Sequence, residues 1–213
     1  MRVLITGSEG YLGKILQTEL TKHGHEVFGF DNCLYNQARY QFKDNPPKKD
    51  ITSIRDMYKA TKGMDVVVAL AAIVGDPACA LDEEETISVN FEATRVLKSV
   101  CETNNVKKII FASSCSGYGV YDGKVADENA PVKPLSLYAK TRIMSEELLA
   151  SYVSEYKIVR FGTLYGASPR MRFDLVANIM TAMAVDGGKI KVNGGEQWRP
   201  MTHVRDAAKA IRL

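Results

Sequence analysis

The stretch "SLYAKTR", residues 136–142, contains a tyrosine that can exchange a proton, Tyr138, and a cation four residues later, Arg142. Tyr138 and Arg142 are four residues apart and share one face of a helix, whereas Lys140 lies about 200° around the axis from Tyr138. Free tyrosine has a pKa of about 10, and a close cation favours its anion. Tyr138 is therefore a candidate proton acceptor, with Arg142 as the cation that tunes it. The alternative is a Tyr–Arg pair on a helix surface.

The N-terminal stretch "VLITGSEGYLG" places three spaced glycines between a predicted strand and a predicted helix. Gly7 permits a tight turn, Gly10 lets the backbone approach a pyrophosphate, and Gly13 lets the helix pack on the strand. The N–H groups that open the helix, including those of Tyr11 and Leu12, can then bind the anion. Spaced glycines also occur in plain turns, but this position favours a dinucleotide site.

Further cofactor candidates follow the predicted strands. Asp31 ends the strand in "VFGFDN", about 20 residues after the glycines, where a carboxylate accepts both ribose hydroxyls of an adenosine and repels a 2′-phosphate. We therefore predict NAD as the cofactor, although Asp31 could instead cap the next turn. Asp50 and Ile51 could border the adenine, and the small residues of "LAAI", Leu70, Ala71 and Ala72 among them, would let a cofactor lie close. Both stretches could also be mere packing.

The elements that must position these residues alternate between short apolar strands and helices. The predicted strands are "RVLIT", "HEVFGFD", "MDVVVAL", "VKKIIFASS" and "YKIVRFG", and the main predicted helices span residues 11–24, 83–104, 137–153 and 173–185. This alternation predicts an α/β fold with a Rossmann-type doubly wound parallel sheet. We expect residues 1–165 to form an NAD-binding domain. Residues 166–213 should form a partial substrate-binding region that continues onto the last strand and helix of the Rossmann core.

The composition excludes several classes of protein. The chain has 213 residues, 46% of them hydrophobic, and a formal net charge of +3 without a dominant basic cluster, so we expect no nucleic-acid partner. No apolar run approaches about 18 residues, so we expect no membrane span. The four cysteines lack CxxC spacing, which argues against a metal site and fits a reducing compartment. A cytoplasmic protein is the simplest interpretation.

The order and spacing of nine modest motifs resemble the extended short-chain dehydrogenase/reductase family, which includes the nucleotide-sugar epimerases and dehydratases. They are T-G-x-x-G-x-x-G at Thr6 to Gly13, an acidic residue at Asp31, D-I at Asp50, L-A-A at Leu70, N-x-x-x-T at Asn90 to Thr94, S-S-x-x-x-Y-G at Ser113 to Gly119, a tyrosine at Tyr138, R-F-G-T-x-Y-G at Arg160 to Gly166, and R-P-x-x-H-V-x-D at Arg199 to Asp206. The resemblance covers almost the whole chain.

This resemblance implies roles for particular residues. Tyr138 would exchange a proton with a sugar hydroxyl, and Ser114 would bind the same oxygen. Arg142 stands where the family has a lysine that binds the nicotinamide ribose and lowers the tyrosine pKa. Asn32 and Asn90 join the cofactor-binding candidates, which already include Tyr138 and Arg142. Thr163, Asn178 and Arg199 are candidates for binding a nucleotide-diphosphate sugar, although Thr163 replaces an asparagine frequent in the family and a surface role for Arg199 is equally ordinary.

The neighbours of Ser114 distinguish among the activities of the family. Members that resemble sugar 4,6-dehydratases carry an Asp and a Glu directly after this residue, whereas this chain has Cys115 and Ser116. Elimination of water is therefore disfavoured. We expect hydride transfer at a sugar carbinol, that of C4, in an NAD-dependent epimerase, with a 4-ketoreductase as the alternative.

The end of the chain raises a different alternative. "VRDAAKAIRL" reads as the opening of a helix, so we expect a C-terminal substrate lobe to be largely missing. A truncated chain could be a non-catalytic NAD-binding module. Relatives commonly form homodimers through two helices, and we expect the same pairing here through residues 83–104 and 137–153.

Overall fold

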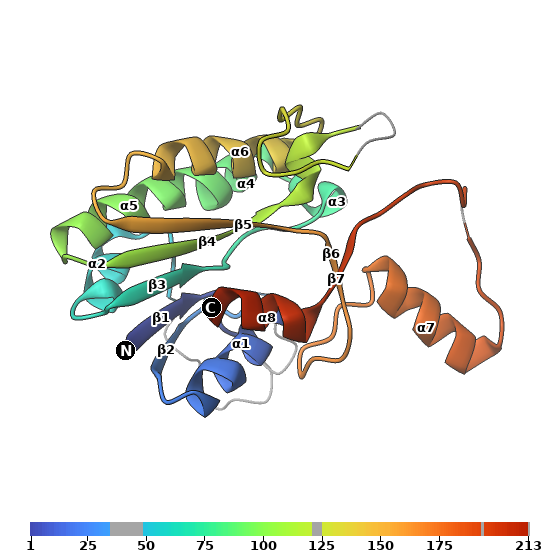
Figure 1. The fold of residues 1–213 in the computed structure, drawn as a ribbon, viewed down its shortest axis with the longest axis horizontal. Coiled ribbons are helices and arrows are strands. Elements are labelled where there is room, and N and C mark those ends of the chain that lie inside the picture. Colours follow the sequence, from blue (N-terminus) through green and yellow to red (C-terminus); the bar gives the residue numbers. More distant parts are fainter. Residues whose placement is uncertain (35–48, 121–124, 193, 213) are drawn as a thin grey trace.

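Five parallel strands form the central sheet of the protein, in the order β2-β1-β3-β4-β5 (Figure 1). The computed structural model describes residues 1–34, 49–120, 125–192 and 194–212. The strands are β1 (Arg2–Thr6), β2 (Glu26–Phe30), β3 (Val66–Ala69), β4 (Lys108–Ser114) and β5 (Glu155–Phe161). Four of them fall within predicted strands, β5 begins one residue before its predicted strand, and the parallel α/β sheet is confirmed.

Alternate residues of the strands pack against helices on opposite faces of the sheet. Leu4 and Val67 face α2 (Ile54–Thr61), α5 (Ala93–Thr103) and α6 (Leu137–Leu149). Val3 and Val68 belong to the other core, against α1 (Tyr11–Lys22) and α8 (Val204–Arg212). Burial on both faces explains why these strands read as continuous apolar runs rather than alternating ones. Figure 1 shows the two helical layers.

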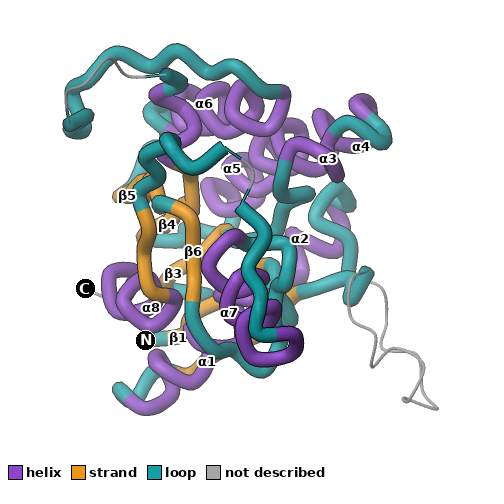
Figure 2. Tube along the Cα trace, turned by 90° about the vertical axis from the view of Figure 1, so that its right-hand side faces the viewer, coloured by secondary structure: helices purple, strands orange, loops and turns teal. Residues whose placement is uncertain are grey.

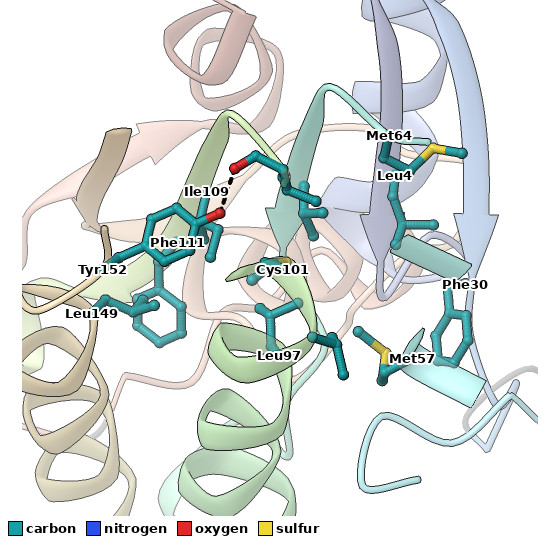
Figure 3. Close-up of a cluster of buried hydrophobic side chains, with 14 residues drawn as sticks. Leu4, Phe30, Met57, Met64, Leu97, Cys101, Ile109, Phe111, Leu149 and Tyr152 are labelled. Atoms are coloured by element: carbon teal, nitrogen blue, oxygen red, sulfur yellow. Dashed lines mark hydrogen bonds between the residues drawn. The ribbon is translucent and has the colours of Figure 1, made fainter. Parts of the chain in front are cut away.

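The first of these cores lies beneath α5 and α6 (Figure 3). Leu97 of α5 and Leu149 of α6 pack there with Ile109 of β4. The hydroxyl of Tyr152 donates a hydrogen bond to the main-chain oxygen of Val106 at 2.5 Å, so its polar end is satisfied inside the core. This packing fixes α6, which carries Tyr138, on the sheet.

The segment predicted as one helix over residues 83–104 has a break in its periodicity. It consists of α4 (Glu83–Ile87), a π-helical turn over Ser88–Glu92, and α5. Asn90 lies in the π turn and is fully buried. Its side chain accepts a hydrogen bond from the N–H of Ile73 and donates one to the oxygen of Ile73, both at 2.9 Å. The π turn therefore ties this helix to the loop after β3.

Three short helices were not predicted: α2, α3 (Asp76–Cys79) and a 3₁₀ helix over Cys115–Tyr118. The helix predicted over residues 173–185 is α7 (Val176–Gly187), and the helix predicted to begin in "VRDAAKAIRL" is α8. The strand before α8, β7 (Met201–His203), pairs with β6 (Thr163–Tyr165) in a separate two-stranded parallel sheet rather than with the central sheet. Figures 1 and 2 show this small sheet and α7 beside the carboxyl edge of the main sheet.

Within the described part of the chain, no helix has the length and apolar character needed to cross a membrane. The same residues contain no group of three or more His, Cys, Asp or Glu side chains arranged to hold a metal ion.

Candidate active site

The loop between β1 and α1 makes a tight cradle at the carboxyl edge of the sheet. Gly7 has a φ of +73°, a conformation that favours glycine, and its N–H donates to the oxygen of Phe30 at 2.8 Å. A Cβ atom on Gly7 would lie 2.8 Å from the main-chain nitrogen of Ala71. The loop can therefore lie directly against the end of β3 only because residue 7 is glycine.

The other two glycines bring the start of α1 close to this turn. A Cβ on Gly13 would lie 2.2 Å from the oxygen of Gly7, and one on Gly10 would lie 3.1 Å from the same atom. Gly10 is the N-cap of α1 and offers no side chain to the first N–H groups, those of Tyr11 and Leu12 among them. The cradle thus has the close backbone and free helix N-terminus that a pyrophosphate needs.

Asp31 follows β2 and lies next to this cradle. One carboxylate oxygen accepts the N–H of Glu9 at 2.9 Å, and the other accepts the N–H of Cys33 at 2.7 Å. Asp31 does cap a turn, as the alternative interpretation held, but an ionised carboxylate has about four acceptor positions and keeps two for ribose hydroxyls. Asn32 is exposed, and its side chain accepts from the N–H of Leu34.

A small hollow opens on the α5 side of the cradle. Thr6, Ile51, Ala71 and Val89 line it together with six other residues. The structure thus brings Ile51 and Ala71, two predicted cofactor residues, to one depression. The other residues of this group lie around it: Leu70 and Ala72 are half-buried, and Asp50 is exposed and accepts two hydrogen bonds from Thr52. The side chain of Asn90 forms hydrogen bonds with the N–H and the oxygen of Ile73, so it holds the loop rather than facing this hollow.

Tyr138 and Arg142 lie one helical turn apart at the start of α6, whose N-cap is Ser136. The guanidinium carbon of Arg142 is 5.6 Å from the ring centre of Tyr138 and 5.0 Å from that of Phe111. Lys140 is exposed, so Arg142 is the cation beneath the tyrosine. Arg142 itself is only 2% exposed.

The hydrogen bonds of Arg142 are few and long. Its terminal nitrogens reach the oxygens of Ala112 and Asn90 at 3.4 Å each. Its Nε is buried and has no hydrogen-bond partner among the residues that the structure describes. A buried cation with spare donors fits a site that receives ribose hydroxyls, because unpaired buried donors are costly.

Burial decides the acidity of Tyr138. Removal from water raises the pKa of its phenol above the ordinary value, and the charges of Arg142 and Arg172 offset only part of that rise. The cation beneath the ring therefore favours the phenolate, as the sequence predicts, but its effect on the pKa of Tyr138 is smaller than that of burial.

Ser114 ends β4 and caps the 3₁₀ helix that follows it. Its Oγ accepts hydrogen bonds from the N–H and the hydroxyl of Ser116 at 3.2 and 2.9 Å. Gly117 of this turn packs on α6, since a Cβ there would lie 2.6 Å from Cδ1 of Ile143. The segment from Ser114 through the 3₁₀ helix Cys115–Tyr118, which we call the serine turn, is therefore a neighbour of the first turns of α6, which carry Tyr138.

A buried polar network behind this turn was not predicted. Glu146 forms an ion pair with Arg160 and accepts a hydrogen bond from the Ser113 hydroxyl. Arg160 also donates to the hydroxyl of Tyr118 at 2.9 Å. These hydrogen bonds to Glu146 and Tyr118 raise the pKa of Arg160. The four-residue spacing of Tyr138, Arg142 and Glu146 was a signal that could have found Glu146.

The three predicted substrate residues have different surroundings. Thr163 pairs with Met201 across the small sheet, and its N–H donates to the oxygen of Pro200, which places it near the exposed Arg199. Asn178 is instead 6% exposed.

The side chain of Asn178 uses both of its N–H donors and one lone pair of its oxygen within the protein. It bonds the N–H of Gly166, the oxygen of Arg172 and the hydroxyl of Tyr11. Asn178 therefore fastens the loop after β6 to the start of α1, and among the described residues one lone pair of its oxygen has no hydrogen-bond partner.

Residues 3–213 match the family model described as the NAD dependent epimerase/dehydratase family. The chain belongs to this family. An uncharacterized UDP-glucose epimerase of Bacillus subtilis is 30% identical, over 99% of this chain and 71% of its own length. A UDP-N-acetyl-alpha-D-glucosaminuronate decarboxylase of Bacillus cytotoxicus is 31% identical, over 98% of this chain and 69% of its own length.

Solved structures agree with this assignment. The UDP-glucose 4-epimerase of Thermus thermophilus, in complex with NAD, has a TM-score of 0.83 and 28% identity, covering all of this chain and 74% of that one. MoeE5 in complex with UDP-glucuronic acid and NAD has a TM-score of 0.84 and 30% identity, covering all of this chain and 71% of that one. The recognition of an NAD-dependent enzyme family from the sequence is thereby confirmed.

Asp31 generates a prediction about cofactor choice. We expect the protein to bind NAD(H) more tightly than NADP(H), because the carboxylate would repel a 2′-phosphate and no arginine comes immediately after Asp31. Asp31→Ala should weaken NAD(H) binding and reduce the difference between the dissociation constants for NAD(H) and NADP(H), as measured by fluorescence titration with both cofactors. Asp206→Ala, on the exposed surface of α8, is the control and should change neither constant. Equal affinities in the unmodified protein, or tighter binding of NADP(H), would contradict this assignment.

Proposed function

We propose that the protein is a nucleotide-sugar 4-epimerase in which Tyr138 exchanges the C4 hydroxyl proton and Ser114 binds the same oxygen. The observation that carries the proposal is the stacking of Tyr138 over a buried cation, Arg142, beside the serine turn and at the edge that holds the glycine cradle. UDP-glucose epimerases among the relatives support the same reaction class.

The residues of the cradle would hold NAD, which supplies the hydride acceptor and donor. The turn at Gly7 to Gly13 would bind the pyrophosphate, and Asp31 the adenosine ribose. Ile51 and Ala71 would border the adenine, and the spare donors of Arg142 would meet the nicotinamide ribose. Their present contacts leave these groups free for such roles, since Asp31 keeps acceptor positions and Arg142 has an unpaired Nε.

The residues after Ser114 argue for hydride transfer without loss of water. Elimination needs an acid and a base beside the sugar, and the positions after Ser114 are Cys115 and Ser116. Burial raises the pKa of the Cys115 thiol, which makes it a poor base at neutral pH. Glu146 is already engaged by Arg160 and Ser113.

The raised pKa of Tyr138 favours a second candidate, a 4-ketoreductase. A protonated phenol is ready to donate to the oxygen of a keto sugar, whereas an epimerase must also accept a proton in the other half of the cycle. Both reactions share the site and differ in whether the hydride returns to the sugar.

The first test is a panel of UDP-, GDP- and dTDP-sugars and their 4-keto derivatives, offered to the full-length protein with NAD(H). An epimerase interconverts the C4 epimers without net change in the absorbance of reduced nicotinamide. A ketoreductase oxidises the reduced nicotinamide, so this absorbance falls. Tyr138→Phe should reduce either rate at least about a hundredfold. A protein that binds NAD(H) but turns over no member of the panel would contradict the proposal and favour the non-catalytic module.

Arg142 generates a second prediction. A guanidinium is bulkier than the ammonium of a lysine and is too weak an acid to pass a proton onward. We expect the native protein to bind NAD but to turn over slowly, and Arg142→Lys to raise turnover. Because only the deprotonated phenol accepts a proton and its pKa is raised, sugar oxidation should accelerate with rising pH in both forms.

The pH–rate profiles of the native protein and of Arg142→Lys, measured together with NAD affinity, show whether arginine at this position slows turnover. If Arg142→Lys lowers turnover and leaves cofactor affinity unchanged, arginine is the adapted residue and the site is not a weakened one.

The exposed apolar residues of α4 and α6 generate a third prediction. Ile87 and Met144 are 40% and 42% exposed, while Phe91 and Leu148 are half-buried. Full burial of such a side chain is worth about 1.5–3 kcal/mol, so we expect a homodimer that pairs these helices between two copies.

Sedimentation at several concentrations measures this state. The double variant Ile87→Asp/Met144→Asp should be monomeric, whereas Val185→Asp, on the distant α7, should leave the dimer intact. A native protein that stays monomeric at high concentration would rule the dimer out.

A further inference from the structure

Ser116 gives two hydrogen bonds to the side chain of Ser114. Its hydroxyl lies 2.9 Å from Ser114 Oγ, and its N–H lies 3.2 Å from the same atom. A hydroxyl group has one proton to donate and two lone pairs to accept with. When the Ser116 hydroxyl is the donor, both lone pairs of Ser114 are taken, and its proton is the one hydrogen-bonding capacity that remains.

The main chain holds Ser116 in place for this contact. Its carbonyl oxygen accepts the N–H of Gly119 at 3.2 Å, and the oxygen of Gly117 accepts the N–H of Lys133 at 2.9 Å. At the other end of the turn, Ser113 is anchored to Glu146. The turn is fastened on both sides of Ser116, which fixes the backbone position from which its hydroxyl reaches Ser114.

We propose that Ser116 is a positioning residue that holds Ser114 as an obligate hydrogen-bond donor to the reacting sugar oxygen. Ser114 then cannot accept the hydroxyl proton of the sugar and relay it, and proton exchange is left to Tyr138 alone. The proposal rests on the proposed function for the identity of the reacting oxygen. A carboxylate at position 116 would accept from Ser114 instead and would withdraw its proton from the substrate.

Kinetics on the full-length protein test the catalytic consequence. Ser116→Ala should lower kcat about tenfold, with KM within about twofold of the native value, because Ser114 is then free to rotate away from the oxygen. Ser116→Thr keeps the hydroxyl and should restore most of kcat. Cys115→Ala, a change next to Ser116 that leaves both hydroxyl groups in place, is the matched control and should keep native kcat.

A double-mutant cycle separates positioning from general support of the fold. If Ser116 acts through Ser114, the pair Ser114→Ala/Ser116→Ala should have the same kcat as Ser114→Ala alone. A residue that merely stabilises the turn would lower kcat further in the double variant. Native kcat in Ser116→Ala would also overturn the proposal, and a higher kcat would overturn it by showing that Ser114 had been giving its proton to Ser116.

A thiol probe tests the hydrogen bonds without any turnover. In Ser114→Cys, two donors from Ser116 should stabilise the thiolate, so adding Ser116→Ala should raise the pH midpoint of alkylation at residue 114. Iodoacetamide and mass spectrometry resolve this position from the native cysteines. An unchanged midpoint would overturn the proposal, even if the sugar panel succeeds. A raised midpoint would support it, even if the panel fails.

Discussion

The guanidinium of Arg142 is held almost entirely out of water between the rings of Phe111 and Tyr138, and the candidate active site depends on it. Burying a charge costs several kcal/mol unless partners replace its water. Cation–π contacts offset about 0.5–2 kcal/mol of that cost, and the long bonds to two carbonyl oxygens add to this. These contacts leave the buried Nε of Arg142 without a hydrogen-bond partner among the described residues. A ribose hydroxyl of a cofactor could accept from such a donor.

The fold brings the partners of this cation together from three elements. β4 supplies Phe111 and the oxygen of Ala112, the π turn supplies the oxygen of Asn90, and α6 supplies Arg142 with Tyr138. The π turn makes this possible, because Asn90 offers its oxygen to α6 while its side chain holds the loop after β3. The same loop lies against the glycine cradle, so cofactor loop and catalytic helix share one scaffold.

Much of this arrangement could be predicted from the sequence, because strand hydrophobicity and spaced glycines act locally. The five strands follow from short apolar runs, the cradle from glycines three residues apart, and the Tyr138–Arg142 stack from a spacing of four residues. The roles of Asn90 and Asn178 could not be predicted from the sequence, because each depends on main-chain groups that only folding brings close. The raised pKa of Tyr138 also escaped prediction, since spacing reveals a neighbouring cation but not the loss of water around a phenol.

The direct test of this account is the pKa of Tyr138 in the native protein and in Arg142→Met, measured by carbon NMR of labelled tyrosine. Tyr138→Phe identifies the resonance. If the buried cation tunes the phenol, the pKa of Tyr138 should lie above its ordinary value in the native protein and higher still in Arg142→Met. An unchanged or lower pKa in Arg142→Met would mean that Arg142 does not act on Tyr138.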